Sequence, residues 1–272
     1  MKHKFFSLLS LFVIIVITAP ASGMAVPPRL PTTGEAIQSP QDALNVELIA
    51  QLGGVTSAVA IQGSYAYIGV GPRLVILDIS NPSSLVVVGM TQPFPSAVQG
   101  VAVSGEYAYI ADGGAGLLVV NISDPASPTG VGVYDTPGAA RGVAVSGSYA
   151  YVADNTYGLR AVNITDPAHP VEVGFYDTPG RAKGVTVVGG YAYVADNDAG
   201  LRVVDISLPS SPIEAGFIDT PGFASEVVVS GTYAYVADDS GLRGVDISNP
   251  TSPAEASSYA SFGAAKDVAI SG

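Results

Sequence analysis

The sequence predicts an all-β protein in which one four-stranded unit is repeated around a common axis, the arrangement of a β-propeller. The first observation is a strict repeat: the tripeptide Tyr-Ala-Tyr occurs five times at intervals of 42 residues, beginning at Tyr65, Tyr107, Tyr149, Tyr191 and Tyr233. The second is that every interval holds four short runs with strand-like alternation and none with a helical period. Four strands in about 42 residues are typical of one propeller blade, and so small a unit must pack on its neighbours.

The chain begins with a segment, residues 1–25, that has the pattern of a secretory signal peptide. Lys2 and Lys4 form a short basic start, an apolar stretch runs from Phe5 to Ile17, and small residues follow. The apolar stretch is too short for a membrane-spanning helix, which needs about 20 residues. We therefore expect a cleaved signal, no transmembrane segment in the mature chain, and secretion to the extracellular space or the cell envelope.

Residues 26–45 are rich in proline and polar residues without an apolar period, so they predict an extended linker. The repeats occupy residues 46–272. Val46–Leu52 has the pattern of an outermost strand without its blade, five complete units follow, and Lys266–Ser271 has the pattern of an innermost strand alone. Because an open array exposes unpaired strand edges, we predict five full blades with partial strands at both ends, part of an incomplete six- or seven-bladed propeller truncated at the C-terminus.

The third copy shows the four strands of the unit most clearly. They are expected at 141–146 (strand A), 149–153 (strand B), 159–164 (strand C) and 171–176 (strand D), with turn-forming residues between them. Strand A contains mostly Gly, Ala and Val, and such small residues suit the crowded innermost position of a blade. Strand B places both tyrosines on one face. We expect them to pack between blades; a sugar-binding stack is the alternative.

The sequences of strand C resemble those of a known family. Leu74–Ser80 (Leu-Val-Ile-Leu-Asp-Ile-Ser), Leu117–Ser123 and Leu201–Ser207 resemble the LVIVD repeat of bacterial and archaeal surface proteins, and Leu159–Thr165 and Leu242–Ser248 are looser copies. The resemblance covers nearly all of the chain after the linker. It implies a secreted or surface-displayed bacterial propeller, and it supplies no catalytic residues.

Composition excludes several classes of function. The net charge is −12, with 11 basic residues, so nucleic acids and anionic membranes are unsuitable partners, because both require a basic patch. The chain has no cysteine, and outside the predicted signal peptide its one histidine is His169. Disulfides, thiol nucleophiles, histidine-based triads and the usual zinc sites are therefore excluded. A pair of carboxylates remains available for catalysis.

Acidic residues in the loop after strand B form a candidate metal site. The calcium candidates are Asp154, Asp196, Asp198 and Asp238. Calcium needs six to eight converging oxygen ligands, and the spacing here lacks the alternation of a calcium-binding loop. We expect each carboxylate to cap backbone N–H groups of its own turn instead. The chain is thus expected to need no cofactor, with calcium as the alternative.

A second group of polar residues lies at or beside the start of strand A, which the repeat places at the mouth of the central channel. Its members are Gln99, Arg141, Lys183, Glu226, Lys266 and Asp267. Most other positions repeat nearly unchanged, whereas these differ in charge from copy to copy. A mixed-charge ring of this kind could bind a small anion or an acidic peptide. The alternative is a set of surface ion pairs between blades, which contribute little stability.

The sequence thus predicts a secreted or cell-surface propeller that serves as a non-catalytic binding or adhesion module for a protein or glycan partner. One alternative is a carboxylate-dependent carbohydrate-active enzyme, with Glu226 and Asp267 acting at the channel mouth. Another is a structural spacer domain within a larger surface protein. Scaffolds of this type host many functions. Only the residues of the site and their geometry can therefore distinguish these three functions.

Overall fold

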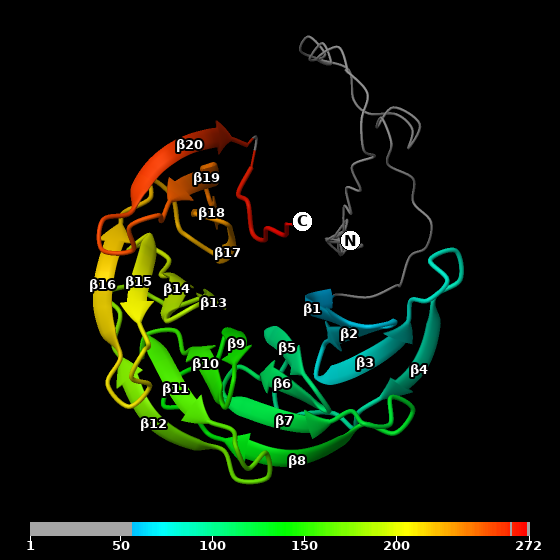
Figure 1. Ribbon diagram of the computed structural model, residues 1–272. Coiled ribbons are helices and arrows are strands. Elements are labelled where there is room, and N and C mark those ends of the chain that lie inside the picture. The colour runs from blue at the N-terminus through cyan, green and yellow to red at the C-terminus, as the bar shows by residue number, and fades with distance from the viewer. Residues whose placement is uncertain (1–55, 262, 271–272) are drawn as a thin grey trace, which may run out of the picture.

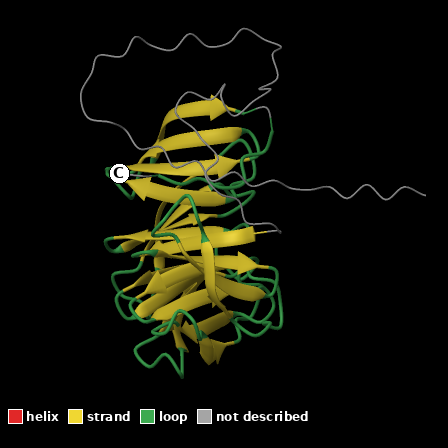
Figure 2. Cartoon of the chain, turned by 90° about the vertical axis from the view of Figure 1, so that its right-hand side faces the viewer, coloured by secondary structure: helices red, strands yellow, loops and turns green. Residues whose placement is uncertain are grey.

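The computed structural model describes residues 56–261 and 263–270 of the 272-residue chain. In this part of the chain all regular structure is β-strand (Figure 2), and it includes no helix with the length and apolarity that crossing a membrane requires. The predicted signal peptide (1–25), the predicted linker (26–45) and the outermost strand predicted at Val46–Leu52 lie outside the described residues.

The strands form five four-stranded antiparallel sheets, each made of consecutive strands, and each sheet is one blade. Blade 1 contains β1 (Thr56–Gln62), β2 (Tyr65–Val70), β3 (Arg73–Asp78) and β4 (Val86–Met90). Blade 2 contains β5 (Gly100–Ser104), β6 (Tyr107–Ala111), β7 (Leu117–Asn121) and β8 (Thr129–Tyr134). Blade 3 contains β9 (Gly142–Ser146), β10 (Tyr149–Ala153), β11 (Leu159–Asn163) and β12 (Val171–Tyr176). Blade 4 contains β13 (Gly184–Val188), β14 (Tyr191–Ala195), β15 (Leu201–Asp205) and β16 (Ile213–Ile218). Blade 5 contains β17 (Glu226–Ser230), β18 (Tyr233–Asp238), β19 (Gly241–Asp246) and β20 (Ala254–Ala260).

The five blades lie side by side around a common axis, with blades 1 and 5 at the two ends of the arc (Figure 1). The first strand of each blade, strand A, lies nearest the axis, and the fourth, strand D, forms the outer rim. Neighbouring A strands contact one another along the whole series from β1 to β17. The predicted propeller of four-stranded blades is therefore confirmed.

Small residues in strand A are required because these inner strands approach one another closely. A Cβ at Gly142 would lie 2.7 Å from the Lys183 carbonyl oxygen in the next blade, and one at Gly100 would lie 3.1 Å from the Arg141 carbonyl oxygen. Contacts this short with backbone atoms leave no room for a side chain. The glycines thus set the distance between neighbouring blades at the axis.

The hydrophobic core is divided into layers between successive blades. In one such layer, Tyr151 and Leu159 of blade 3 pack against Val194 and Ile206 of blade 4. Equivalent clusters join blades 1 and 2, 2 and 3, and 4 and 5, but among the described residues no cluster joins blade 5 to blade 1. In blades 1 to 4 the second tyrosine of strand B is almost fully buried in these layers, as in Tyr151 with 3% exposure, whereas Tyr235 of blade 5 is partly exposed. The predicted packing role of the tyrosines is confirmed.

Strand D bends around the outside of each blade by means of a β-bulge. The register between strands C and D shifts by one residue in every blade, for example between Ala161 and Val162. Such a bulge increases the local twist of the strand. A glycine next to the bulge lets the C–D turn of the following blade approach: a Cβ at Gly132 would collide with the carbonyl oxygen of Pro167. Ser257, opposite Gly244, takes this place in blade 5.

The prediction of an innermost strand at Lys266–Ser271 is wrong in the part of this segment that the structure describes, residues 266–270. Residues 264–270 contain no strand. The segment before this expected strand is nevertheless bonded to the end of strand B of blade 5, because the Ala265 N–H donates to the Asp238 carbonyl oxygen at 3.1 Å. Every other strand A pairs with its own strand B, and residues 264–270 have no such partner among the described residues. Without that ladder, the alternating sequence alone does not form a strand.

Candidate functional site

The loops after strand B and the segments before strand A are joined to one another on one face of the propeller. The loop residue Asn155 of blade 3 exchanges two backbone hydrogen bonds with Ala182, at 3.1 and 3.0 Å, and the same bridge joins Gly113 to Ala140. Asn155 has a positive φ of 50°, a conformation that asparagine tolerates better than most residues. Each bridge fixes the backbone immediately before a channel-mouth residue, Arg141 or Lys183.

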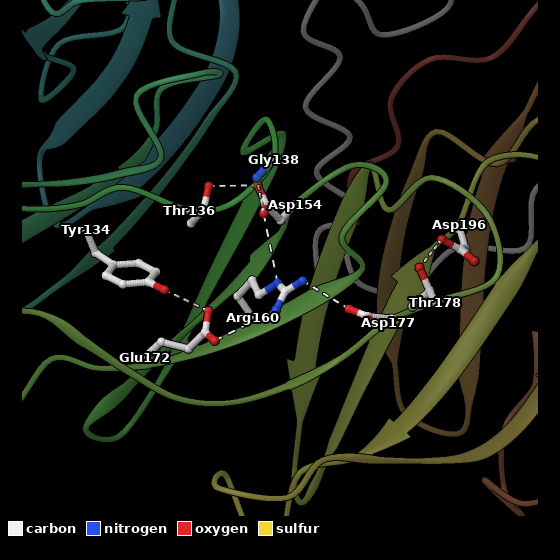
Figure 3. A network of polar contacts seen from close by, with 9 residues as sticks. All are labelled: Tyr134, Thr136, Gly138, Asp154, Arg160, Glu172, Asp177, Thr178 and Asp196. Atoms are coloured by element: carbon white, nitrogen blue, oxygen red, sulfur yellow. Dashed lines mark hydrogen bonds and ion pairs between the residues drawn. The ribbon is translucent and has the colours of Figure 1, made fainter.

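A buried aspartate reinforces each of these joints. In blade 3, Asp154 is fully buried and accepts hydrogen bonds from Thr136 Oγ1 (2.7 Å) and from the Gly138 N–H (2.8 Å). In blade 4 Asp196 accepts from Thr178 Oγ1 in the same way (Figure 3). It also accepts from the Gly180 N–H. Burial raises the pKa of Asp154 above its usual value, although these hydrogen bonds oppose the shift.

The expected role of these aspartates is therefore corrected. They do not mainly cap their own turns: the carboxylates of Asp112, Asp154 and Asp196 bind the segment that precedes strand A of the same blade. Asp238 does both, because it accepts from the Ser240 N–H in its own turn and from the Gly222 N–H. The sequence could not show this partner, since the two segments are 16 residues apart and two strands lie between them.

Arginine side chains in strand C fill the space where a cation would approach these carboxylates. Arg160, 4% exposed, lies with Nε 4.0 Å from Asp154 Oδ2, Nη1 3.8 Å from Glu172 Oε1 and Nη2 3.0 Å from Asp177 Oδ1 (Figure 3). Its guanidinium also stacks over the Phe175 ring at 4.5 Å. Arg202 repeats this arrangement in blade 4, and Arg243 pairs with Asp238 and Glu255 in blade 5.

This arginine network was not predicted from the sequence, although a signal for it exists. Tyr134 of blade 2 donates to Glu172 of blade 3 (2.9 Å), so the network also ties neighbouring outer strands together. Arginine in strand C occurs together with glutamate in strand D in blades 3 to 5. In blade 2 the corresponding residues are Leu118 and Gly130. The joint appearance of the two charges along the chain indicates that they are partners.

The calcium candidates do not form a metal site in the described residues. There, no three His, Asp or Glu side chains come together in a way that could hold a metal ion. Asp154 and Asp196 are already satisfied by hydrogen bonds and lie beside arginine, whereas Asp198 is exposed. A Ca²⁺ ion at Asp154 or Asp196 would have to displace a guanidinium from the carboxylate.

The residues predicted at the channel mouth do lie together around the axis. Arg141 Nη1 donates to Gln99 Oε1 of the preceding blade at 3.1 Å. Lys183 in the next blade is half-buried, and its pKa is lowered first by burial and then by the positive charges of Arg141, Arg181 and Lys266. These three positive charges therefore lie within electrostatic range of Lys183. The exposed Arg181 is a member of the group that the sequence analysis missed.

Two carboxylates, Glu226 and Asp267, lie near one another where blade 5 follows blade 4. A Cβ at Gly184 would collide with the Glu226 carboxylate, which therefore covers strand A of blade 4. Burial, together with the negative charge of Asp267, raises the pKa of Glu226 to about 7. Lys266 Nζ lies 2.8 Å from Asp239 Oδ1, the one ion pair among the predicted channel-mouth residues within the described chain.

Comparison with solved structures shows the fold. The chain is similar to the β-propeller domain of Cps50 (Swd1) from Myceliophteria thermophila, with 13% identity, a TM-score of 0.64, and coverage of 78% of this chain and 73% of that one. It is similar to the computationally designed Ika8 protein (9% identity, TM-score 0.59, 80% and 79% coverage) and to U3-55K (13%, 0.59, 75% and 66%). Identities this low show the propeller architecture alone.

Comparison with protein families is more specific. Among curated proteins no relative matches the chain. The model of the LVIVD repeat matches five times, at residues 53–92, 96–136, 137–178, 179–220 and 221–261. These matches coincide with the five blades and together cover most of the sequence, so the chain belongs to the LVIVD repeat family.

Proposed function

We propose that this propeller is a non-catalytic binding module, secreted or displayed at the cell surface, that contacts a protein or glycan partner with its channel-mouth face. The observation that carries the proposal is that the polar residues fall into two sets, one that holds the structure together and one that is left at the axis. The repeated side chains, such as Asp154 and Arg160, are committed to holding loops and blades together. The side chains that differ between copies converge on the axis, where Arg141 and Lys183 lie.

Exposed aromatic residues on the same loops extend this face. Tyr157 follows strand B of blade 3 and is 44% exposed, and Phe223 precedes strand A of blade 5 and is 52% exposed. Aromatic side chains with exposed surface are typical of binding faces, because they offer large contact areas at a low entropic cost. Secretion is supported by the signal pattern of residues 1–25 and by the resemblance to surface proteins.

The proposal can be tested by measuring binding of the labelled protein to the surface of its source cells and to arrays of glycans and peptides. Tyr157→Ala and Phe223→Ala should each weaken binding several-fold. The control is His169→Ala, which alters an exposed side chain in a C–D turn at the opposite end of the strands. Absence of binding to every surface, or an equal loss in the control, would contradict the proposal.

One observation favours a second function, a carboxylate-dependent carbohydrate-active enzyme. A pKa of about 7 lets Glu226 carry a proton near neutral pH, as a general acid must, and Asp267 is the carboxylate beside it. Turnover of polysaccharides, lost in both Glu226→Gln and Asp267→Asn, would support this function over simple binding. A panel of polysaccharides left intact by the wild-type protein would exclude it for those substrates.

We also infer that the ring is completed by a sixth or seventh blade. The support is the bond from the Ala265 N–H to the Asp238 carbonyl oxygen (3.1 Å). It resembles the bond from the Ala224 N–H to the Asn197 carbonyl oxygen (2.9 Å) before blade 5, with an acceptor one position earlier in the repeat. A further blade would place a strand B beside residues 264–270. The mass of the protein isolated from its source should then exceed that of this chain by at least one repeat. A soluble native monomer without an additional repeat would contradict this inference.

A further inference from the structure

Three basic residues at the channel mouth have no acidic partner among the described residues. Arg141, Arg181 and Lys183 form no ion pair there, although the chain has 23 acidic residues. The arginines of strand C in blades 3 to 5 differ from these residues, because each of them contacts at least two carboxylates. In so acidic a chain, three cations that gather at one place without a counter-charge are not explained by the fold.

Arg141 shares with Arg160 and Arg202 a buried Nε that has no hydrogen-bond acceptor, but unlike them it has no carboxylate partner among the described residues. Its Nη1 donates to Gln99 Oε1 at 3.1 Å. Leaving a buried donor unsatisfied costs about 1–3 kcal/mol, and more when the group is charged. The backbone around Arg141 is fixed by the bridge at Ala140 and by the bond from the Arg141 N–H to the Ala153 carbonyl oxygen. A ligand oxygen could satisfy the guanidinium group of Arg141 if the side chain turned to present Nε, while the backbone stayed in place.

Nearby carboxylates do not neutralise this group. Lys266 is paired with Asp239, whereas Glu226 accepts from the Val227 N–H. Because burial raises the pKa of Glu226 to about 7, this carboxyl carries only part of a negative charge at neutral pH. The remaining acid, Asp267, is exposed and accepts from the Val268 N–H. None of these carboxylates forms an ion pair with Arg141, Arg181 or Lys183.

We propose that Arg141, Arg181 and Lys183 bind a small polyanion at the channel mouth, a ligand that carries two or more negative charges on carboxylate or phosphate groups. The inference rests on the proposed binding role of this face and specifies its ligand. A guanidinium group donates in the fork geometry that suits carboxylate and phosphate oxygens. A single negative charge would leave most of the repulsion around Lys183 in place, whereas a neutral glycan would leave all of it.

The test is isothermal titration calorimetry of the purified protein at pH 7 and low ionic strength. Citrate, succinate and inorganic phosphate are the probes, and acetate and glucose are the controls. We expect polyanion binding that weakens as salt is added and that falls at least tenfold in Arg141→Gln and in Lys183→Gln. Lys183→Arg keeps the charge and should bind nearly as the wild type does. Arg73→Gln, which removes an equal charge in β3, should bind like the wild type.

Circular dichroism and thermal unfolding first show that each variant is folded. The ranking of citrate against phosphate then identifies the preferred group. If no polyanion binds, or if Lys183→Gln and Arg73→Gln lose affinity equally, the inference is overturned. The proposed binding function would survive that result, because its own test depends on Tyr157 and Phe223. If the protein bound polyanions but bound no cell surface, glycan or peptide, the polyanion site would be supported and the proposed surface-binding function would be contradicted.

Discussion

At the scale of single residues, the buried carboxylates of successive blades differ in their hydrogen-bond and ion-pair partners. Asp154 and Asp112 occupy the same place in blades 3 and 2, and both are fully buried. Asp154 has two hydrogen-bond donors and Arg160, whereas Asp112 has the Ser96 N–H and a second oxygen without a partner. The two sites therefore differ in how well the charge is compensated, although the sequence around them is alike.

This difference predicts unequal effects of the same substitution. Asp154→Ala removes two hydrogen bonds and leaves Arg160 with an incomplete set of partners, so it should lower the free energy of unfolding by about 3 kcal/mol. Asp112→Ala removes one hydrogen bond and relieves an unpaired buried oxygen, so the loss should be about 1 kcal/mol or less. Urea denaturation measures both values. Equal losses would show that Arg160 does not stabilise the buried aspartate.

Glu226 predicts a dependence of stability on pH. Its pKa is about 7 in the folded chain and near 4.5 in the unfolded chain, so the folded state binds more protons between these values. The folded state is therefore fully stabilised by protonated Glu226 below pH 4.5. This part of the free energy of unfolding, up to roughly 3 kcal/mol, is lost as the pH rises to about 7. Glu226→Gln should remove this loss. Unfolding curves of the two proteins from pH 4 to 8 should converge at low pH, and a constant difference would contradict the assignment.

Sequence reasoning placed some of these residues and missed others for a physical reason. The tyrosine faces follow from the period-two alternation of a strand, and the Gln99–Arg141 contact follows from their equivalent places in successive copies. Arg160 and the partners of Asp154 depend on how loops of one blade meet segments that are distant in sequence. No local pattern contains that information, because it arises only when the blades are assembled.

At the scale of elements, strand identity and order were predictable, whereas strand contacts with the next blade were not. The runs 149–153 and 171–176 were expected as strands B and D and are β10 and β12 within the same bounds. The strand expected at Lys266–Ser271 is absent from residues 264–270, because alternation does not form a strand without a paired neighbour. The bulge in strand D was not predicted either, since it is specified by packing against the C–D turn of the adjacent blade.

Two glycines of β8 provide a matched test of that packing. A Cβ at Gly132 would collide with the Pro167 carbonyl oxygen of blade 3, whereas a Cβ at Gly130 would meet nothing within 4 Å. Gly132→Ala should therefore destabilise the protein by about 2 kcal/mol through displacement of the turn. Gly130→Ala should be neutral or slightly stabilising, because alanine restricts the unfolded chain. Thermal unfolding compares them, and similar melting temperatures would show that blades 2 and 3 tolerate a wider spacing.

At the scale of the whole molecule, the repeat made the architecture predictable because five copies of one pattern impose the same neighbour contacts five times. Stability of such an array is approximately a sum of terms for each blade and each interface between blades. In the described residues blade 3 packs on neighbours at both sides through two hydrophobic layers, whereas blade 5 packs on blade 4 alone. Position in the array, rather than local sequence, should then determine local stability.

Hydrogen exchange can test this directly on strands of nearly identical sequence. Amides of β10 (Tyr149–Ala153) in blade 3 should exchange at least tenfold more slowly than those of β18 (Tyr233–Asp238) in blade 5, because opening blade 5 breaks one interface and opening blade 3 breaks two. The shared Tyr-Ala-Tyr-Val-Ala sequence makes their intrinsic exchange rates equal, so mass spectrometry of the two peptides is a controlled comparison. Equal protection in the isolated chain would mean that the blades open only together, and the nearest-neighbour account of this propeller would fail.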